Sequence, residues 1–121
     1  MKQKSGNITE LSKLLYIYII IMNKLIVILT KSNRKNKKFR VYFPDRRKTI
    51  HFGDSRYSDY TIHHNPGRKS QYIARHRKRE NWNDFYTAGF WSYHLLWNKR
   101  TIDDSIKDIE SNYNLDIINN S

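Results

Sequence analysis

The sequence predicts an α+β fold, in which a small antiparallel three-stranded meander is followed by about three helices. Residues 38–43 and 48–52 alternate apolar and polar side chains, a period typical of strands with one buried face. Further along, Ile102, Ile106 and Ile109 follow one another at spacings of four and three, which predicts an amphipathic helix. Strands are therefore expected to precede helices along the chain.

The meander is predicted from three short segments that are separated by turns. Residues 25–31 are β-branched and apolar, which favours a buried strand, and a polar turn at 32–37 follows them. The two alternating segments come next and are joined by a Pro-Asp-Arg turn at 44–46. Gly53 then ends the third strand. Connections this short favour antiparallel neighbours.

The helices are predicted from their end signals and from the distribution of apolar side chains. Asn65 and Pro66 suit the cap and first turn of a helix that continues to residue 80. Residues 88–97 are apolar on nearly every side, so we expect this helix to be the most buried. Thr101 is followed by two acidic residues and opens the amphipathic helix, which we place at 102–112.

The first 21 residues are expected to be an amino-terminal extension that lies outside the fold. Met22 opens a stretch that looks like an ordinary protein start and leads straight into a strand, so translation from Met1 and from Met22 both stay open. The apolar run over 14–22 ends at two polar residues and is shorter than the roughly 20 residues that span a bilayer. No stable membrane insertion is expected.

These boundaries leave a single α+β domain over residues 22–112, a common domain size. Residues 113–121 are rich in asparagine, and we expect them to form a frayed tail. The chain has no cysteine, which excludes disulfides, thiolate zinc sites and cysteine nucleophiles.

The charge of the chain is strongly positive and unevenly distributed. Lys and Arg number 23 against 11 acidic residues, a formal net charge of +12. Residues 31–100 hold 18 of the basic and five of the acidic residues, which is a net +13, whereas residues 101–121 carry a net −4. Such a field attracts polyanions, of which nucleic acid is the commonest. The alternatives are a solvated basic surface or one that meets an acidic protein.

The predicted helix from residue 66 to 80 is the best nucleic-acid candidate. At 100° per residue, Arg68, Tyr72, Arg75 and Arg79 lie within about 60° of one another, so one aromatic ring stands among three guanidinium groups. In the alternative interpretation Tyr72 packs inward and the arginines are simply solvated. A basic turn at 34–38 adds cations that can contact phosphates, whereas the turn at 46–48 would lie at the opposite end of the meander. The predicted nucleic-acid-binding residues are Arg34, Lys35, Lys37, Lys38, Arg68, Lys69, Tyr72, Arg75, Arg77, Lys78 and Arg79.

No catalytic residue, metal site or cofactor is predicted. The five histidines show no familiar ligand spacing, and no nucleophile elbow marks a serine as activated; the histidines are His51, His63, His64, His76 and His94. A metal-dependent nuclease would have to use the 51–64 segment together with Glu80. We favour a structural role for the extended loop expected over 54–65, with Tyr57 and Tyr60 packed on the core and Asp59 capping backbone amides or pairing with an arginine. The tryptophans are expected in the core, with a stacking platform as the alternative for Trp82.

The chain from Met22 to about residue 109 resembles a family of small basic proteins of giant nucleocytoplasmic large DNA viruses, for which no activity is established. The resemblance rests on motifs in a fixed order: 38–43, Thr49-Ile50-His51-Phe52-Gly53, Tyr57-Ser58-Asp59-Tyr60-Thr61, Tyr72-Ile73-Ala74-Arg75-His76, Glu80-Asn81-Trp82, Thr87-Ala88-Gly89-Phe90-Trp91-Ser92 and Leu95-Leu96-Trp97-Asn98-Lys99, with the helix that opens at Thr101. It implies a viral origin and a place in the virion or the infected host-cell cytoplasm. Tyr93-His94 depart from the basic residue expected there, so no basic site is assigned to them.

These observations lead to three functional expectations. The first is a non-enzymatic protein that binds the phosphate backbone of DNA or RNA non-specifically through a Lys/Arg-rich face. The second is a structural virion component that binds acidic virion proteins, and the third is the metal-dependent nuclease.

Overall fold

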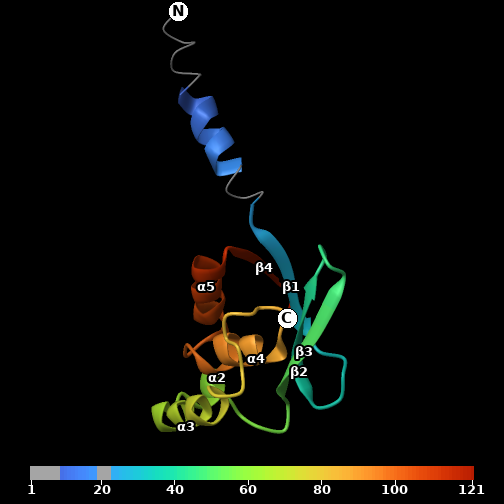
Figure 1. Cartoon of the computed structure of the whole chain (residues 1–121), viewed down its shortest axis with the longest axis vertical. Coiled ribbons are helices and arrows are strands. Elements are labelled where there is room, and N and C mark those ends of the chain that lie inside the picture. Colours follow the sequence, from blue (N-terminus) through green and yellow to red (C-terminus); the bar gives the residue numbers. More distant parts are fainter. Residues whose placement is uncertain (1–8, 19–22) are drawn as a thin grey trace, which may run out of the picture.

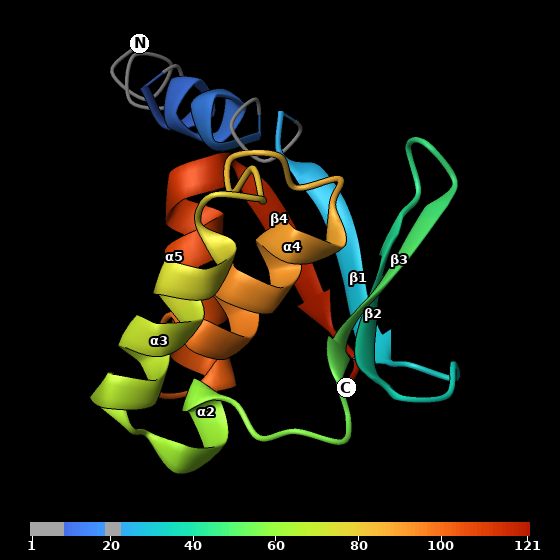
Figure 2. The same ribbon diagram turned by 60° about the horizontal axis from the view of Figure 1, so that its bottom comes forward.

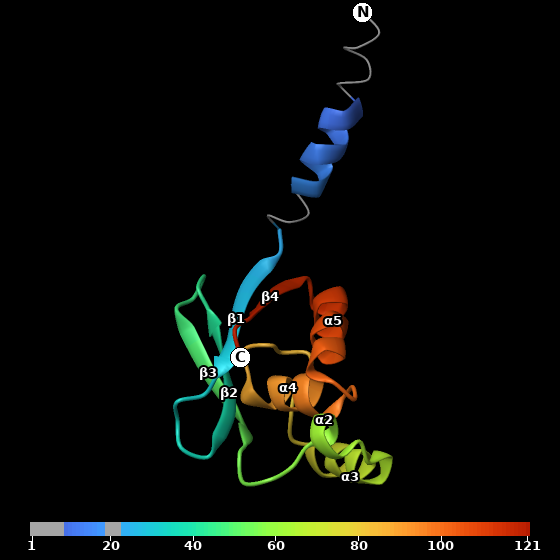
Figure 3. The same ribbon diagram turned by 180° about the vertical axis from the view of Figure 1, so that it is seen from behind.

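The computed structural model describes residues 9–18 and 23–121 and consists of two layers, a four-stranded sheet and a set of helices on one of its faces (Figure 1). The same helices lie on the same side of the sheet when the molecule is seen from behind (Figure 3). The elements in chain order are β1 (Leu25–Lys31), β2 (Lys37–Phe43), β3 (Lys48–Asp54), α2 (Tyr60–His63), α3 (Pro66–His76), α4 (Ala88–Trp91), the π-helix η1 (Ser92–Trp97), α5 (Ile102–Tyr113) and β4 (Leu115–Asn119).

The first three strands form the predicted antiparallel meander. Val41 in β2 pairs with Leu29 in β1 and with Ile50 in β3, so the alternation seen in the sequence continues across the sheet. These inward-facing side chains are buried, because the helices cover that face. The α+β class is confirmed, but the three predicted strands belong to a larger, four-stranded sheet, and five helical segments follow them in place of about three.

The prediction of a frayed tail over 113–121 is wrong. Asn114 ends α5 in a left-handed conformation (φ 53°), and the chain then returns as β4, which runs parallel to β1. Leu115 and Ile117 point into the core, and the Ile117 amide donates to the Glu110 carboxylate at 2.9 Å. The sheet is therefore mixed, in the order β3-β2-β1-β4. Only two apolar residues at a spacing of two, Leu115 and Ile117, indicate this strand in the sequence. Its backbone is hydrogen-bonded to the edge of β1 that β2 leaves unpaired.

The helix starts follow their predicted caps. Asn65 Oδ1 accepts hydrogen bonds from the amides of Gly67 (2.9 Å) and Arg68 (3.2 Å), and Thr101 Oγ1 accepts one from Asp104 (3.1 Å). The ends differ more, since α3 stops at residue 76 instead of 80. The loop expected over 54–65 contains the short helix α2.

Residues 88–97 form the most buried helical segment, as predicted, and supply the centre of the core. Trp91 is fully buried, and its ring lies edge-on to Phe43 (6.2 Å between centroids) and next to Phe52 (6.1 Å). The Trp91 indole N–H donates to the carbonyl of Phe85 at 2.7 Å. The indole therefore packs on β2 and β3 with its one polar atom satisfied.

The predicted extension over 1–21 is described only in part. Residues 9–18 are helical, and their large apolar side chains are exposed. Residues 1–8 and 19–22, with both possible starts, lie outside the described residues. Among the helices that are described, none is long and apolar enough to span a bilayer.

The strand β4 makes a testable contribution to stability. We expect Leu115→Ala to lower the free energy of unfolding by about 3 kcal/mol, because the leucine is 1 % exposed and its removal leaves a cavity beside β1. The measurement is urea denaturation followed by circular dichroism. Ile118→Ala is the matched control: this side chain is 41 % exposed on the same strand, so its removal is expected to cost less than about 0.5 kcal/mol. A frayed tail would make both substitutions neutral.

Candidate nucleic-acid interface

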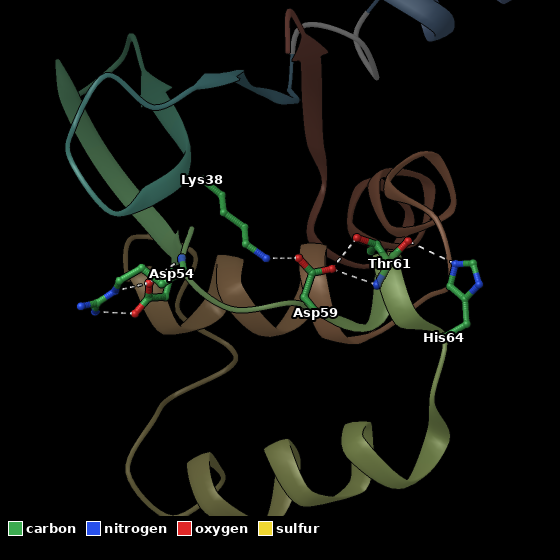
Figure 4. Close-up of polar contacts among 6 residues, drawn as sticks. Lys38, Asp54, Asp59, Thr61 and His64 are labelled. Atoms are coloured by element: carbon green, nitrogen blue, oxygen red, sulfur yellow. Dashed lines mark hydrogen bonds and ion pairs between the residues drawn. The ribbon is translucent and has the colours of Figure 1, made fainter.

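One buried carboxylate connects the sheet to the helical layer. Asp59 is 2 % exposed and accepts a hydrogen bond from Lys38 Nζ, in β2, at 2.5 Å. Its other oxygen accepts from the amide and the hydroxyl of Thr61, and so caps α2 (Figure 4). The predicted capping role of Asp59 is confirmed, although its cationic partner is a lysine. Lys38 is consequently committed to this pair and is not a free phosphate contact.

Tyr72 does not join the exposed arginines of α3, so this part of the predicted stacking surface is wrong. Its ring stacks on Trp97 (4.4 Å between centroids, 5° between planes) on one side and on His76 (4.1 Å) on the other. Only 6 % of the residue is exposed, and burial raises the pKa of its hydroxyl. With both ring faces covered, no base can stack there. The alternative in which Tyr72 packs inward is the correct one.

Lys69 is also drawn into the fold. Its Nζ donates to the carbonyl of Asn98 at 2.7 Å and lies 5.0 Å from the centre of the Tyr60 ring. Burial, and after it the charge of Lys99, lowers the pKa of the Lys69 ammonium. This lysine therefore fastens α3 to the end of η1 and does not extend freely into solvent.

The other eight predicted residues are exposed. Within the described part of the chain, none of them forms an ion pair with a carboxylate. We call these eight cations the basic end: Arg34, Lys35, Lys37, Arg68, Arg75, Arg77, Lys78 and Arg79. Their positive charge is available to a partner in solution, because no neighbouring carboxylate neutralises it by direct contact.

The basic end draws on two segments that are distant in sequence. The turn between β1 and β2 lies at the same end of the molecule as α3, whereas the turn between β2 and β3 lies at the opposite end (Figures 1 and 2). A single cavity is lined by Lys37 from the first segment and by Arg75 from α3. As the meander predicts, the 34–38 and 46–48 turns do not form one patch.

The cavity between these two segments has a volume of about 330 Å³. Its apolar lining comes from Phe52, Leu96 and Trp97, and its acidic lining from Asp54, Asp59 and Glu80. Asp54 is held by Arg56 through two hydrogen bonds of 3.0 and 2.8 Å, which lower the pKa of the Asp54 carboxyl to about 2. The pairing visible in Figure 4 thus occupies two of the three carboxylates.

Glu80, the carboxylate that a nuclease would require, is occupied as well. It accepts hydrogen bonds from His76 Nδ1 (2.9 Å) and from the indole of Trp82 (2.8 Å). Its side chain fits against Gly89 in α4, where a Cβ atom would lie 2.8 Å from Glu80 Oε2. Trp82 in turn stacks on Tyr93 at 4.1 Å, and this contact covers one face of its ring. Through these contacts Glu80 links α3, the 80–87 loop and α4.

The prediction that Tyr57 packs on the core is wrong. The residue is 69 % exposed and lies at the edge of the cavity. The guanidinium carbon of its neighbour Arg56 lies 5.9 Å from the centre of the ring. The segment from 54 to 58 has no periodicity, so the sequence held no signal that Tyr57 faces outward, whereas the capping role of Asp59 was predictable.

Two of the histidines, His51 and His94, are hydrogen-bonded within the fold. His51 shares a 2.7 Å hydrogen bond with Ser32, and desolvation followed by the charges of Arg34 and Arg40 lowers the pKa of its imidazole. His94 Nε2 bonds the carbonyl of Trp82 at 2.7 Å, and burial lowers its pKa. Across residues 9–18 and 23–121, no three His, Asp or Glu side chains converge in a way that could hold a metal ion.

Comparison with known proteins adds a partial family match. Residues 27–76 match the model of a family of unknown function (DUF5754). This segment runs from β1 through α3, and it contains the basic turn, the Lys38–Asp59 pair and Arg75. No curated protein and no solved structure matches the chain.

The buried pair predicts a clear difference between two neighbouring aspartates. We expect Asp59→Asn to lower the free energy of unfolding by about 3 kcal/mol, because the Lys38 ammonium is left largely buried without a counter-charge. Asp54→Asn removes an exposed pair instead, and the unfolding midpoint should hardly move. Guanidinium denaturation measures both.

A double substitution separates the charge effect from the removal of the cap. Lys38→Met combined with Asp59→Asn removes the unpaired ammonium, so it should be more stable than Asp59→Asn alone. Equal instability of the single and double variants would contradict the assigned role of the pair.

Proposed function

We propose that this chain is a small non-enzymatic protein that binds DNA or RNA non-specifically through the basic end. The single observation that carries the proposal is that its eight cations are exposed and none has a carboxylate partner among the described residues. Phosphate groups supply the missing counter-charge, and the release of their condensed counterions drives association.

The acidic residues of the carboxyl-terminal segment do not pair with the cations of the basic end in the described part of the chain. The acidic side chains of this segment lie on α5 and β4, and none of them forms an ion pair with a basic residue in the part that the structure describes. In Figures 1 and 3, α5 lies toward the end of the helical layer opposite to α3. The positive and negative regions of the chain are thus separated in space as well as in sequence.

The side chains of the basic end suit the phosphate backbone more than the bases. Long lysine and arginine side chains on a turn and on a short helix contact phosphates in many orientations. Tyr72, the one ring that could have added stacking on α3, is buried. Binding with little dependence on base sequence follows from this arrangement.

The same exposed charge fits an acidic protein surface, which is the second candidate, a structural virion component. The viral origin and a location in the virion or host cytoplasm stay predictions from the resemblance. No specific observation favours the nuclease, since the three carboxylates that line the cavity are engaged with Arg56, Lys38 and His76.

The proposal predicts that the position of the removed charge matters. The triple variant Arg77→Gln, Lys78→Gln, Arg79→Gln is expected to bind a 20-mer duplex more weakly. The slope of log K against log salt should fall by about 0.9 for each phosphate that the variant no longer neutralises. Fluorescence anisotropy at several salt concentrations measures both quantities.

The matched control removes the same charge from the opposite end of the meander, with Arg46→Gln, Arg47→Gln and Lys48→Gln. It should leave the slope close to that of the unmodified chain. Equal weakening in the two triple variants would show attraction by net charge alone. Binding of acidic polypeptide with no binding of oligonucleotide at low salt would favour the second candidate instead.

A further inference from the structure

We propose that the cavity beside the basic end is a binding site for a single nucleotide unit, either a free nucleoside monophosphate or an unstacked nucleotide of a strand. This inference rests on the proposed function and adds a defined site to it. It follows from the shape of the cavity, from the pairing of its charged groups and from its position.

The cavity lining holds equal numbers of acidic and basic residues, which differ in whether they have partners. All three carboxylates are already engaged: Asp54 with Arg56, Asp59 with Lys38 and Thr61, and Glu80 with His76 and Trp82. Lys37 and Arg75 are exposed and, within the described residues, have no acidic partner. Lys37 and Arg75 can therefore bind an anionic group of a ligand.

The interior of the cavity is suited to a flat apolar group. Phe52 and Leu96, each 1 % exposed, lie beneath the cavity, Trp97 is its half-buried apolar side chain, and Gly53 adds no side chain to the wall beside Leu96. At Gly53 the backbone has φ +76°, and a Cβ atom would lie 2.8 Å from Leu96 Cδ1, so a side chain there would strain the backbone and crowd Leu96. Tyr57 adds an exposed ring at the edge.

The size of the cavity limits what enters it. A volume of about 330 Å³ lies at the lower end of the range for small-molecule sites and accommodates one nucleotide but no stacked pair. A base on the apolar surface with its phosphate at Lys37 and Arg75 uses both features of the cavity. A base within a duplex cannot enter without unstacking, so single strands and strand ends are the form of nucleic acid that fits.

The location of the cavity explains how such a site would act together with the basic end. Lys37 and Arg75 belong both to the cavity lining and to the basic end. A strand held by the remaining cations therefore passes the mouth of the cavity. Insertion of one nucleotide into the cavity would raise the affinity for single strands, and duplex DNA would not gain this contribution.

Calorimetric titration of the full chain with AMP and with 5′-phosphorylated dT12 tests the proposal and separates its two possible sources. The double variant Lys37→Ala, Arg75→Ala should bind AMP and the oligonucleotide about ten-fold or more weakly. The matched control Arg77→Ala, Arg79→Ala removes the same charge from positions that do not line the cavity, and it should leave AMP binding unchanged. Binding of the oligonucleotide with the same weakening, but no binding of AMP, would identify a nucleotide of a strand as the ligand.

A charge-neutral variant tests occupation of the cavity itself. Ala88 is exposed and lines the cavity at the start of α4, so Ala88→Phe fills the space without burial of the new ring in the core. Affinity for AMP or for dT12 should drop about ten-fold, while duplex binding and the unfolding midpoint stay unchanged. Unaltered binding of both probes by Ala88→Phe would overturn the site and leave the proposed function intact. Failure of the unmodified chain to bind either duplex or single strand would overturn both.

Discussion

The buried contact between Lys38 and Asp59 is the constraint on which the rest of this structure depends. It joins the second strand to the start of α2, and α2 leads directly into α3. Charges removed from water are costly unless they are paired and fully hydrogen-bonded, and Asp59 meets this condition with Thr61 as its second donor. The position of α3 in the helical layer is thereby linked to the sheet through one ion pair.

Aromatic stacking is the second interaction that holds α3 in place. Tyr72 lies between Trp97 and His76, and His76 in turn donates to Glu80, which fits against Gly89. This series of contacts joins α3 to both ends of the continuous helix formed by α4 and η1. The rings of Tyr72, Trp97 and His76 are thus packed against one another, and neither face of the Tyr72 ring is open to a ligand.

The distribution of charge follows from these two arrangements. Three carboxylates that line the cavity are paired with Lys38, Arg56 and His76, whereas the cations of the basic end have no carboxylate partner among residues 9–18 and 23–121. The excess of positive charge in the sequence is thus assigned to exposed side chains, two of which line the cavity beside the basic end. The proposals of polyanion binding and of a nucleotide site both derive from this separation of paired and unpaired charges.

Local patterns determined much of this protein without reference to the fold. The alternation around Val41, the caps at Asn65 and Thr101 and the excess of positive charge are all properties of neighbouring residues, so the strands, helix starts and charge balance were predictable. Only the tertiary structure decided that β4 pairs with β1, that Tyr72 and Lys38 are inside and that a cavity separates Lys37 from Arg75. The physical reason is that burial and pairing depend on partners distant in sequence, and helical or strand periodicity does not specify which partner covers a given face.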